Sequence, residues 1–366
     1  MGYIETFKIA LISFPFIALF LTIPFILIEY HRYGSINKFR TLIIYSFILY
    51  LLTIYLLVIL PLPSREEVLK LTTPKMNLIP FNFILDIIKE SSFVLNKPST
   101  YLKSLTDPCI YVVVFNIFMT IPFGIYLRYY YKCSLKKTVI LSFLLSLFFE
   151  LTQLTGLYFI YERPYRMFDV DDLMLNTLGG LIGYFISGLI INYLPTRDKI
   201  DEDSINKGKT VSGLRRITLY LLDTTLYLII YVLILLIINK PYIKYILFIV
   251  YFVIIPFLFN GYTLGSKFLN IKFSFPDKRF LRLFIRAIIT YFYYFGLVYF
   301  ISIIIMKLTN YFNLSTTVKL IIALSTLIGL FIFYLLNTIK ILKCAKIYYD
   351  KFSKVEFVST IKDKDK

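Results

Sequence analysis

The sequence predicts an all-α fold: a polytopic integral membrane protein with about nine transmembrane helices in two helical modules. Hydrophobic residues make up 58% of the 366 residues, and the mean hydropathy of +0.74 is too high for a soluble domain of this size. Apolar runs of about 20 residues, the length of a helix that crosses a bilayer, recur along the chain. The net charge of +18 comes from Lys and Arg residues clustered between these runs. We therefore expect contact with membrane lipids and no nucleic-acid binding.

Nine apolar runs are the expected transmembrane spans. They cover residues 9–28, 41–60, 109–128, 138–157, 171–193, 217–238, 242–259, 284–306 and 317–339. Basic residues gather after the first and third runs, before the eighth run and in the tail. Because cytoplasmic loops carry the excess of Lys and Arg, this distribution places the N-terminus outside and the C-terminus in the cytoplasm.

A polar stretch divides the predicted spans into two modules. Residues 194–213 contain a proline and a run of acidic residues, which predicts a cytoplasmic linker. The linker separates a five-helix module at 1–193 from a four-helix module at 214–350, and a basic cytoplasmic tail follows at 351–366.

The longest external loop is expected between the second and third spans. Within it, Phe81, Ile84, Leu85 and Ile88 have the spacing of one helix face. The helix is too short to span a membrane. It either lies in the outer interface as a lid over a site or packs as an ordinary loop helix.

One face of the predicted helix at 171–193 is acidic at its external end. Asp169, Asp172 and Asn176 recur at helical spacing, and Gly183 continues the same face. Either aspartate could cap the helix, where negative charge is favourable. A cap does not account for three aspartates within four residues.

Three glycines in this predicted helix and one proline in the third predicted span indicate how these helices pack and bend. Gly179, Gly180 and Gly183 allow a second helix to approach closely. Pro122, inside the third predicted span, frees a backbone carbonyl and is expected to kink its helix.

Further polar groups belong to the same region of the chain. The candidate ligand-pocket residues are Asn116, Glu150, Gln153, Arg163, Arg166, Asp169, Asp171, Asp172 and Asn176. Polar groups are costly in hydrocarbon and indicate a functional site by default. One interpretation is an outward-facing acidic pocket for a cationic or hydrogen-bonding headgroup or ion. The other is a set of salt bridges and hydrogen bonds between the two spans, such as Arg166 with Asp169 and Gln153 with Asn176.

The residues indicate no catalytic centre, and catalytic residues are unknown. No Ser, Cys or His arrangement for nucleophilic catalysis is visible. The single histidine, His31, falls on the opposite side of the predicted topology from the carboxylates. We therefore predict no metal and no cofactor, and an enzyme is the less favoured class.

The second module has an acid inside an apolar run. Asp223 lies about two turns into its span, and an intramembrane acid is a functional candidate, with Arg216 or Arg286 as its expected partner. Burial of such a pair for helix packing alone is the alternative. The residues of this second polar site are Arg215, Arg216, Asp223, Thr263, Gly265, Lys267 and Arg286.

Motifs throughout the first module resemble the VanZ-like family. They are Asn77-Leu-Ile-Pro-Phe, Asn116 with Ile121-Pro-Phe-Gly, Phe149-Glu-Leu-Thr-Gln, and Arg166-x-Phe-Asp-Val-Asp-Asp-x-x-x-Asn-Thr-x-Gly-Gly-x-x-Gly. The resemblance implies a multi-pass protein of the bacterial cell membrane. Members of that family are associated with reduced susceptibility to teicoplanin and similar glycopeptides, and the family implies no established reaction or cofactor.

The second module resembles the RDD family. The matching motifs are Leu214-Arg-Arg followed by Asp223, Gly261-Tyr-Thr-Leu-Gly-Ser-Lys, and Arg286 at the head of the next span. The family's second aspartate has no counterpart in residues 242–259. This resemblance implies a part in transport, and a few related proteins exchange cations for protons.

Three functional hypotheses follow. In the first, the acidic pocket binds or moves an envelope component, such as a lipid-linked cell-wall precursor or a glycopeptide, and so influences antibiotic susceptibility. In the second, the protein is a cation- or proton-coupled or small-solute transporter that uses Asp223. In the third, it is a membrane enzyme acting on lipid-linked cell-wall intermediates, with Glu150 and Asp169 as acid and base.

Overall fold

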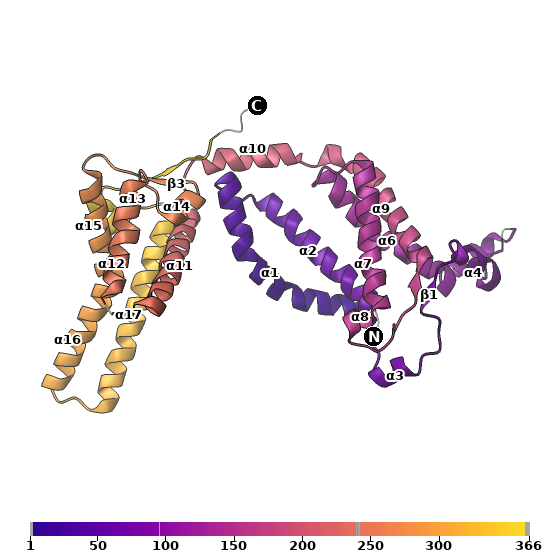
Figure 1. Ribbon diagram of the computed structural model, residues 1–366, viewed down its shortest axis with the longest axis horizontal. Coiled ribbons are helices and arrows are strands. Elements are labelled where there is room, and N and C mark those ends of the chain that lie inside the picture. The colour runs from indigo at the N-terminus through magenta and orange to yellow at the C-terminus, as the bar shows by residue number, and fades with distance from the viewer. Residues whose placement is uncertain (1–2, 95, 239, 241, 363–366) are drawn as a thin grey trace. The chain divides into compact units, whose positions relative to one another are not determined.

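A computed structural model of the chain describes residues 3–94, 96–238, 240 and 242–362. It confirms the all-α class, because helices dominate and only two small two-stranded sheets accompany them (Figure 1). Within this described part, eight helices are long and apolar enough to cross a membrane. The multi-pass arrangement is therefore confirmed, and the side on which each terminus lies stays a prediction.

The predicted span at 242–259 differs from the other eight. It forms a shorter apolar helix, Ile243–Leu258, in place of a full-length span. This helix consists of α12 (Ile243–Ile249), a π-helical turn η3 (Val250–Ile254) and α13 (Ile255–Leu258). A turn with left-handed backbone at Asn260 and Gly261 ends it, and Asn and Gly are residues that adopt this conformation at low cost.

The chain divides into two compact units, each described by itself. The first comprises Met1–Phe20 and Lys38–Ile200, and the second comprises Leu21–Asn37 and Asp201–Lys366. Helix α1 (Tyr3–Tyr33) contributes residues to both units.

The first unit is built around three long helices and α2 (Lys38–Ile59). The long helices are α6 (Pro108–Tyr129), α7 (Leu135–Leu154) and α9 (Val170–Ile190). The shorter elements are α3 (Arg65–Leu69), β1 (Met76–Asn77), α4 (Asn82–Glu90), η1 (Pro98–Thr100), α5 (Tyr101–Ser104), α8 (Gly156–Phe159), β2 (Phe168–Asp169) and η2 (Ile191–Tyr193). The helix expected around Phe81–Ile88 therefore exists as α4.

Glycines bring the backbones of α6 and α9 into direct contact. A Cβ atom at Gly183 would overlap the carbonyl group of Ile121, and one at Gly124 would overlap the carbonyl group of Gly180. Such contact is the expected result of small residues at a helix–helix crossing in a membrane. Pro122 lies within α6 next to this crossing.

The second unit has three long helical segments and a sheet that involves the chain end. Its helices are α11 (Gly213–Ile237), α12, η3, α13, α14 (Leu264–Phe268), α15 (Arg279–Tyr291), the π-helical turn η4 (Phe292–Gly296), α16 (Leu297–Tyr311), α17 (Thr316–Leu342) and α18 (Tyr348–Ser353). Strand β3 (Ile271–Ser274) pairs antiparallel with β4 (Glu356–Ser359). Leu219, Leu269 and Ile271 are among the fully buried residues of its core.

The two segments predicted as a linker and a tail contain regular elements. The polar linker predicted at 194–213 contains helix α10 (Arg197–Gly208). The predicted tail from 351 onward contributes the end of α18 and all of β4. Buried and half-buried residues alternate along β3, so one face of this strand packs against the core and the other is partly covered.

Candidate functional site

A short parallel pairing of β1 with β2 positions the start of α9. Met76 pairs with Phe168, and Asn77 pairs with Asp169. Asp169 is the N-cap of α9: its carboxylate accepts the backbone N–H of Asp171 at 2.9 Å and the side-chain amide of Asn77 at 3.2 Å. The cap satisfies a donor that the first helical turn leaves free. Partial burial raises the pKa of the Asp169 carboxyl above its ordinary value, against the opposing effect of these two donors.

Asp171, in the first turn of α9, forms hydrogen bonds to the start of helix α4. Asp171 is 3% exposed, and its carboxylate accepts the backbone N–H groups of Phe81 at 2.6 Å and Phe83 at 2.9 Å. Phe81 is the N-cap of α4 and has no side-chain acceptor of its own for these donors. Asp171 therefore supplies the cap of α4 from another element of the chain.

Replacing Asp171 by alanine should release α4. The change leaves two part-buried backbone donors without their charged acceptor, and a hydrogen bond to a charged group contributes about 1.5–3 kcal/mol, less where water can replace it. We expect faster chymotrypsin cleavage within residues 78–90 of the purified protein, measured by mass spectrometry. Asp86→Ala, which removes an exposed acid of α4 itself, is the matched control and should leave the cleavage rate unchanged. Equal cleavage of both variants would contradict this role of Asp171.

Below this cap, polar side chains from α6, α7 and α9 meet. The Oε2 atom of Glu150 accepts a backbone N–H at the start of α9 at 2.9 Å. The side-chain amide of Asn116 donates to Asp172. The amide of Asn176 donates to the hydroxyl of Ser146 at 2.9 Å. The Oδ1 atom of Asn176 is buried and accepts no hydrogen bond from the described residues.

These groups line a cavity of about 300 Å³ within the first unit. The predicted pocket residues in its lining are Asn116, Glu150, Gln153, Arg166, Asp172 and Asn176. The other predicted pocket residues, Arg163, Asp169 and Asp171, are not part of the lining. Asp169 instead caps α9, and Asp171 instead caps α4. The amide of Gln153 donates to the carbonyl of Val58 at 3.1 Å.

The two arginines of the loop between α7 and α9 hold the backbone that follows α2. Arg166 donates to the carbonyl groups of Val58 at 2.9 Å and Leu60 at 3.0 Å. Arg163 donates to two further carbonyl groups within residues 71–73. The hydrogen bonds of both arginines thus go from their terminal guanidinium nitrogens to backbone carbonyl groups. Among the described residues, no cation forms an ion pair with the cavity carboxylates.

The cavity is rich in hydrogen-bond acceptors. Glu150, Asp172 and Asn176 are among its lining residues, and the Oδ1 atom of Asn176 is buried without a hydrogen-bond partner among the described residues. A buried acceptor without a partner costs free energy, which a donor on a ligand would recover. The arrangement thus suits a ligand that carries an ammonium group, hydroxyl groups or amide N–H groups. The enzyme hypothesis, in which Glu150 and Asp169 act as acid and base, fits this arrangement less well, because the carboxylate of Asp169 caps α9.

In the second unit, Asp223 is occupied by donors from three residues. Its Oδ1 atom accepts the hydroxyl of Tyr251 at 2.8 Å and the backbone N–H of Gly265 at 2.9 Å, while Oδ2 accepts the hydroxyl of Thr263 at 2.7 Å. The structure thus brings Asp223 together with Thr263 and Gly265 of the predicted second site. Lys267 is exposed.

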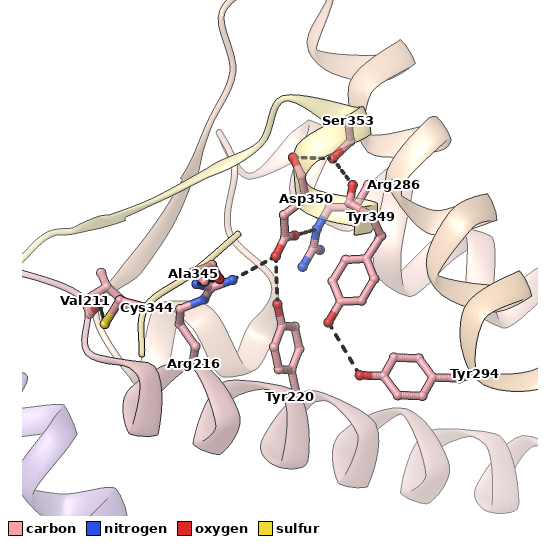
Figure 2. Close-up of polar contacts among 10 residues, drawn as sticks. All are labelled: Val211, Arg216, Tyr220, Arg286, Tyr294, Cys344, Ala345, Tyr349, Asp350 and Ser353. Atoms are coloured by element: carbon pink, nitrogen blue, oxygen red, sulfur yellow. Dashed lines mark hydrogen bonds and ion pairs between the residues drawn. The ribbon is translucent and has the colours of Figure 1, made fainter. Parts of the chain in front are cut away.

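The expected ion pair of Asp223 with Arg216 or Arg286 is wrong, because both arginines bind Asp350 (Figure 2). Arg216 lies 2.9 Å from Oδ2 of Asp350, and Arg286 lies 3.0 Å from its Oδ1. The hydroxyl of Tyr220 also donates to Oδ2, at 3.2 Å. Asp350 is 0% exposed, so this cluster is removed from water.

The aromatic rings of the sheet and α18 complete this cluster. The guanidinium carbon of Arg216 lies 4.4 Å from the ring centre of Phe357. That of Arg286 lies 4.7 Å from the ring centre of Phe273. Cation–π contacts of this kind stabilise buried guanidinium groups. The cluster joins α11, α15, α18 and both strands of the sheet.

Asp350 is the residue that sequence reasoning missed. It is the last residue of the predicted four-helix module, directly before the predicted basic tail and far along the chain from both arginines. The available signal is that Asp350 is the single acidic residue between Lys340 and Lys354. Arg215, predicted for the same site, instead donates to the carbonyl groups of Leu269 and Asn270.

The fold and the polar cavity define the class: a multi-pass α-helical membrane protein with an acceptor-rich site among α6, α7 and α9. Residues 47–191 match the family model described as VanZ/LLP1, and this range contains all three helices. No curated protein and no solved structure matches the chain. The comparisons support the VanZ-like resemblance of the first module, and the RDD resemblance of the second stays a prediction.

Proposed function

We propose that the cavity of the first unit binds an envelope component that presents an amine or several hydroxyl or amide donors, and that this binding influences susceptibility to teicoplanin-type glycopeptides. The observation that carries the proposal is that Glu150, Asp172 and Asn176, which come from two helices, line one cavity. The match of residues 47–191 to VanZ/LLP1 supports the connection with glycopeptides.

The size of the cavity limits the bound group. A volume of about 300 Å³ is at the lower end of the range for small-molecule sites. It suits a headgroup, one sugar ring or the end of a short peptide rather than a whole glycopeptide antibiotic. A lipid-linked cell-wall precursor, which offers such groups on a membrane anchor, is therefore the favoured ligand.

Charge-neutralising variants of the two cavity carboxylates test the proposal. Asp172→Asn and Glu150→Gln preserve side-chain size while removing the charge that attracts a donor-rich ligand. We expect both to lower teicoplanin resistance in complemented cells to the level of cells that lack the protein. The measurements are the minimal inhibitory concentration and the amount of protein in the membrane.

Asp198→Asn is the matched control in the same unit. This aspartate is exposed and forms a surface salt bridge with Lys132, at 2.6 Å, so its loss should leave resistance and expression unchanged. If cells carrying Asp172→Asn and Glu150→Gln, expressed at the level of the unmodified protein, are as resistant as cells carrying Asp198→Asn, the proposal is wrong.

A further inference from the structure

A groove of about 800 Å³ lies in the second unit, between α12 and the continuous helix formed by α15, η4 and α16. Phe248 and Tyr245 line it from α12, and Tyr291, Phe295 and Phe300 line it from the facing helix. Lys244 is the only charged residue among the described residues that line the groove. This is an aromatic and apolar groove with one cation.

The groove arises because its two sides differ in length. The α12–α13 helix, Ile243–Leu258, has 16 residues within its bounds, whereas the facing helix, Arg279–Tyr311, has 33. Figure 1 shows α16 continuing beyond the end of α12. Tyr299 and Phe300 of α16 are accordingly 63% and 52% exposed. The π-helical turn η4 (Phe292–Gly296) lies within this stretch and widens the helix there.

Lys244 lies level with the apolar part of the facing helix. The ring centres of its neighbour Tyr245 and of Tyr291 are 6.0 Å apart. Residues 287–306 form an uncharged stretch of spanning length, and Tyr291 lies near its beginning. Lys307, the next basic residue on that helix, is about 24 Å beyond Tyr291 at 1.5 Å of rise per residue.

Among the described residues, no Asp or Glu forms an ion pair with this lysine. The sequence contains no Asp or Glu between Asp223 and Asp277, or between Asp277 and Asp350. Asp223 accepts donors from Tyr251, Thr263 and Gly265. Lys244 is exposed, and its ammonium nitrogen lies 4.9 Å from the ring centre of Tyr245. An exposed lysine on an otherwise apolar and aromatic groove is stabilised by an anion, and an anionic headgroup can supply one.

We propose that this groove binds an anionic glycerophospholipid, with the phosphate at Lys244 and an acyl chain along Phe295 and Phe300. The charge of the lysine selects the phosphate, and the aromatic walls of the groove accommodate the chain. The volume of the groove is within the range of ligand-binding clefts. This site belongs to the second unit and is independent of the cavity proposed above.

Tryptophan fluorescence provides a direct test, because the chain contains no Trp. The reporter is Phe295→Trp in the full-length protein, reconstituted in vesicles that contain brominated phosphatidylglycerol or brominated phosphatidylcholine. Bromine quenches an indole that it touches. We expect the brominated anionic lipid to reach half-maximal quenching at an about fivefold lower mole fraction than the brominated phosphatidylcholine, which is the effect on binding of one lysine contact with an anionic headgroup. Tyr299→Trp, on the same wall of the groove, is a second reporter should the first variant fail to fold.

Control variants distinguish the contribution of Lys244 to the lipid preference from quenching by general contact with lipid. In the Phe295→Trp protein, Lys244→Gln should remove the preference, Lys244→Arg should retain it, and Lys307→Gln, outside the groove, should leave it intact. Phe331→Trp, 67% exposed on α17, should show no preference between the two lipids. Equal quenching by both lipids in the reporter proteins would overturn the proposal, as would a preference that survives Lys244→Gln.

A competition experiment distinguishes the source of the phosphate. Unbrominated phosphatidylglycerol should restore the fluorescence of Phe295→Trp at a lower concentration than polyprenyl monophosphate does. The opposite order would overturn the assignment of the groove to a glycerophospholipid.

Discussion

Replacing Asp350 by alanine is expected to destabilise the second unit by about 3–5 kcal/mol, the loss seen when one partner of a buried ion pair is removed. The variant would leave Arg216 and Arg286, which are 4% and 7% exposed, without their shared carboxylate. The nearby aromatic rings offset part of this cost but do not neutralise two positive charges. The free energy of unfolding can be measured by denaturation with sodium dodecyl sulfate in mixed micelles.

Two further variants make this result specific. Asp350→Asn keeps the shape of the side chain and removes its charge, so its destabilisation should lie between those of the unmodified protein and Asp350→Ala. Asp277→Ala removes an aspartate that pairs with Arg282 at 2.9 Å but is about half exposed. Its loss should cost far less than the loss of Asp350, because surface ion pairs contribute little to stability. Similar stability of Asp350→Ala and Asp277→Ala would show that the buried cluster does not hold the unit together.

Replacing Gly183 by alanine is expected to destabilise the first unit by about 1–3 kcal/mol or more, as overpacking does in a tight interface. The added methyl group would meet the carbonyl group of Ile121 and the Cα atom of Gly124, both of which are main-chain atoms. A main-chain contact of this kind cannot be relieved by a change of rotamer. The helices α6 and α9 must therefore move apart, which also disturbs the cavity between them.

Gly329 is the matched control for this substitution. It lies within α17, and an added Cβ atom there has nothing within 4 Å. Gly329→Ala should therefore be neutral or stabilise the helix by about 0.5–1 kcal/mol, the difference in helix propensity between Gly and Ala. Thermal unfolding in detergent measures both variants. A Gly183→Ala protein as stable as Gly329→Ala would contradict the close crossing of α6 and α9.

Local features of the site followed from the sequence because helical spacing fixes which residues share a face. Asp172 and Asn176 lie on one side of α9 and Glu150 on α7, and all three line the same cavity. The separate roles of the three aspartates could not be predicted from the sequence. Asp171 caps α4 and Asp169 caps α9, and these roles depend on the pairing of β1 with β2, which has only two residues in each strand. Strands this short leave no periodic signal in a sequence.

By itself, the sequence determined the class of this protein, since the length and hydropathy of its apolar runs set what can cross a bilayer. It also identified the region in which polar side chains meet. Only the tertiary structure decided which charges pair. The arginines bind Asp350 and backbone carbonyl groups, not the acids nearest to them in the predicted spans. The physical reason is that an ion pair requires contact within about 4 Å, and that contact depends on how separate helices pack, whereas spacing along one helix specifies only its own faces.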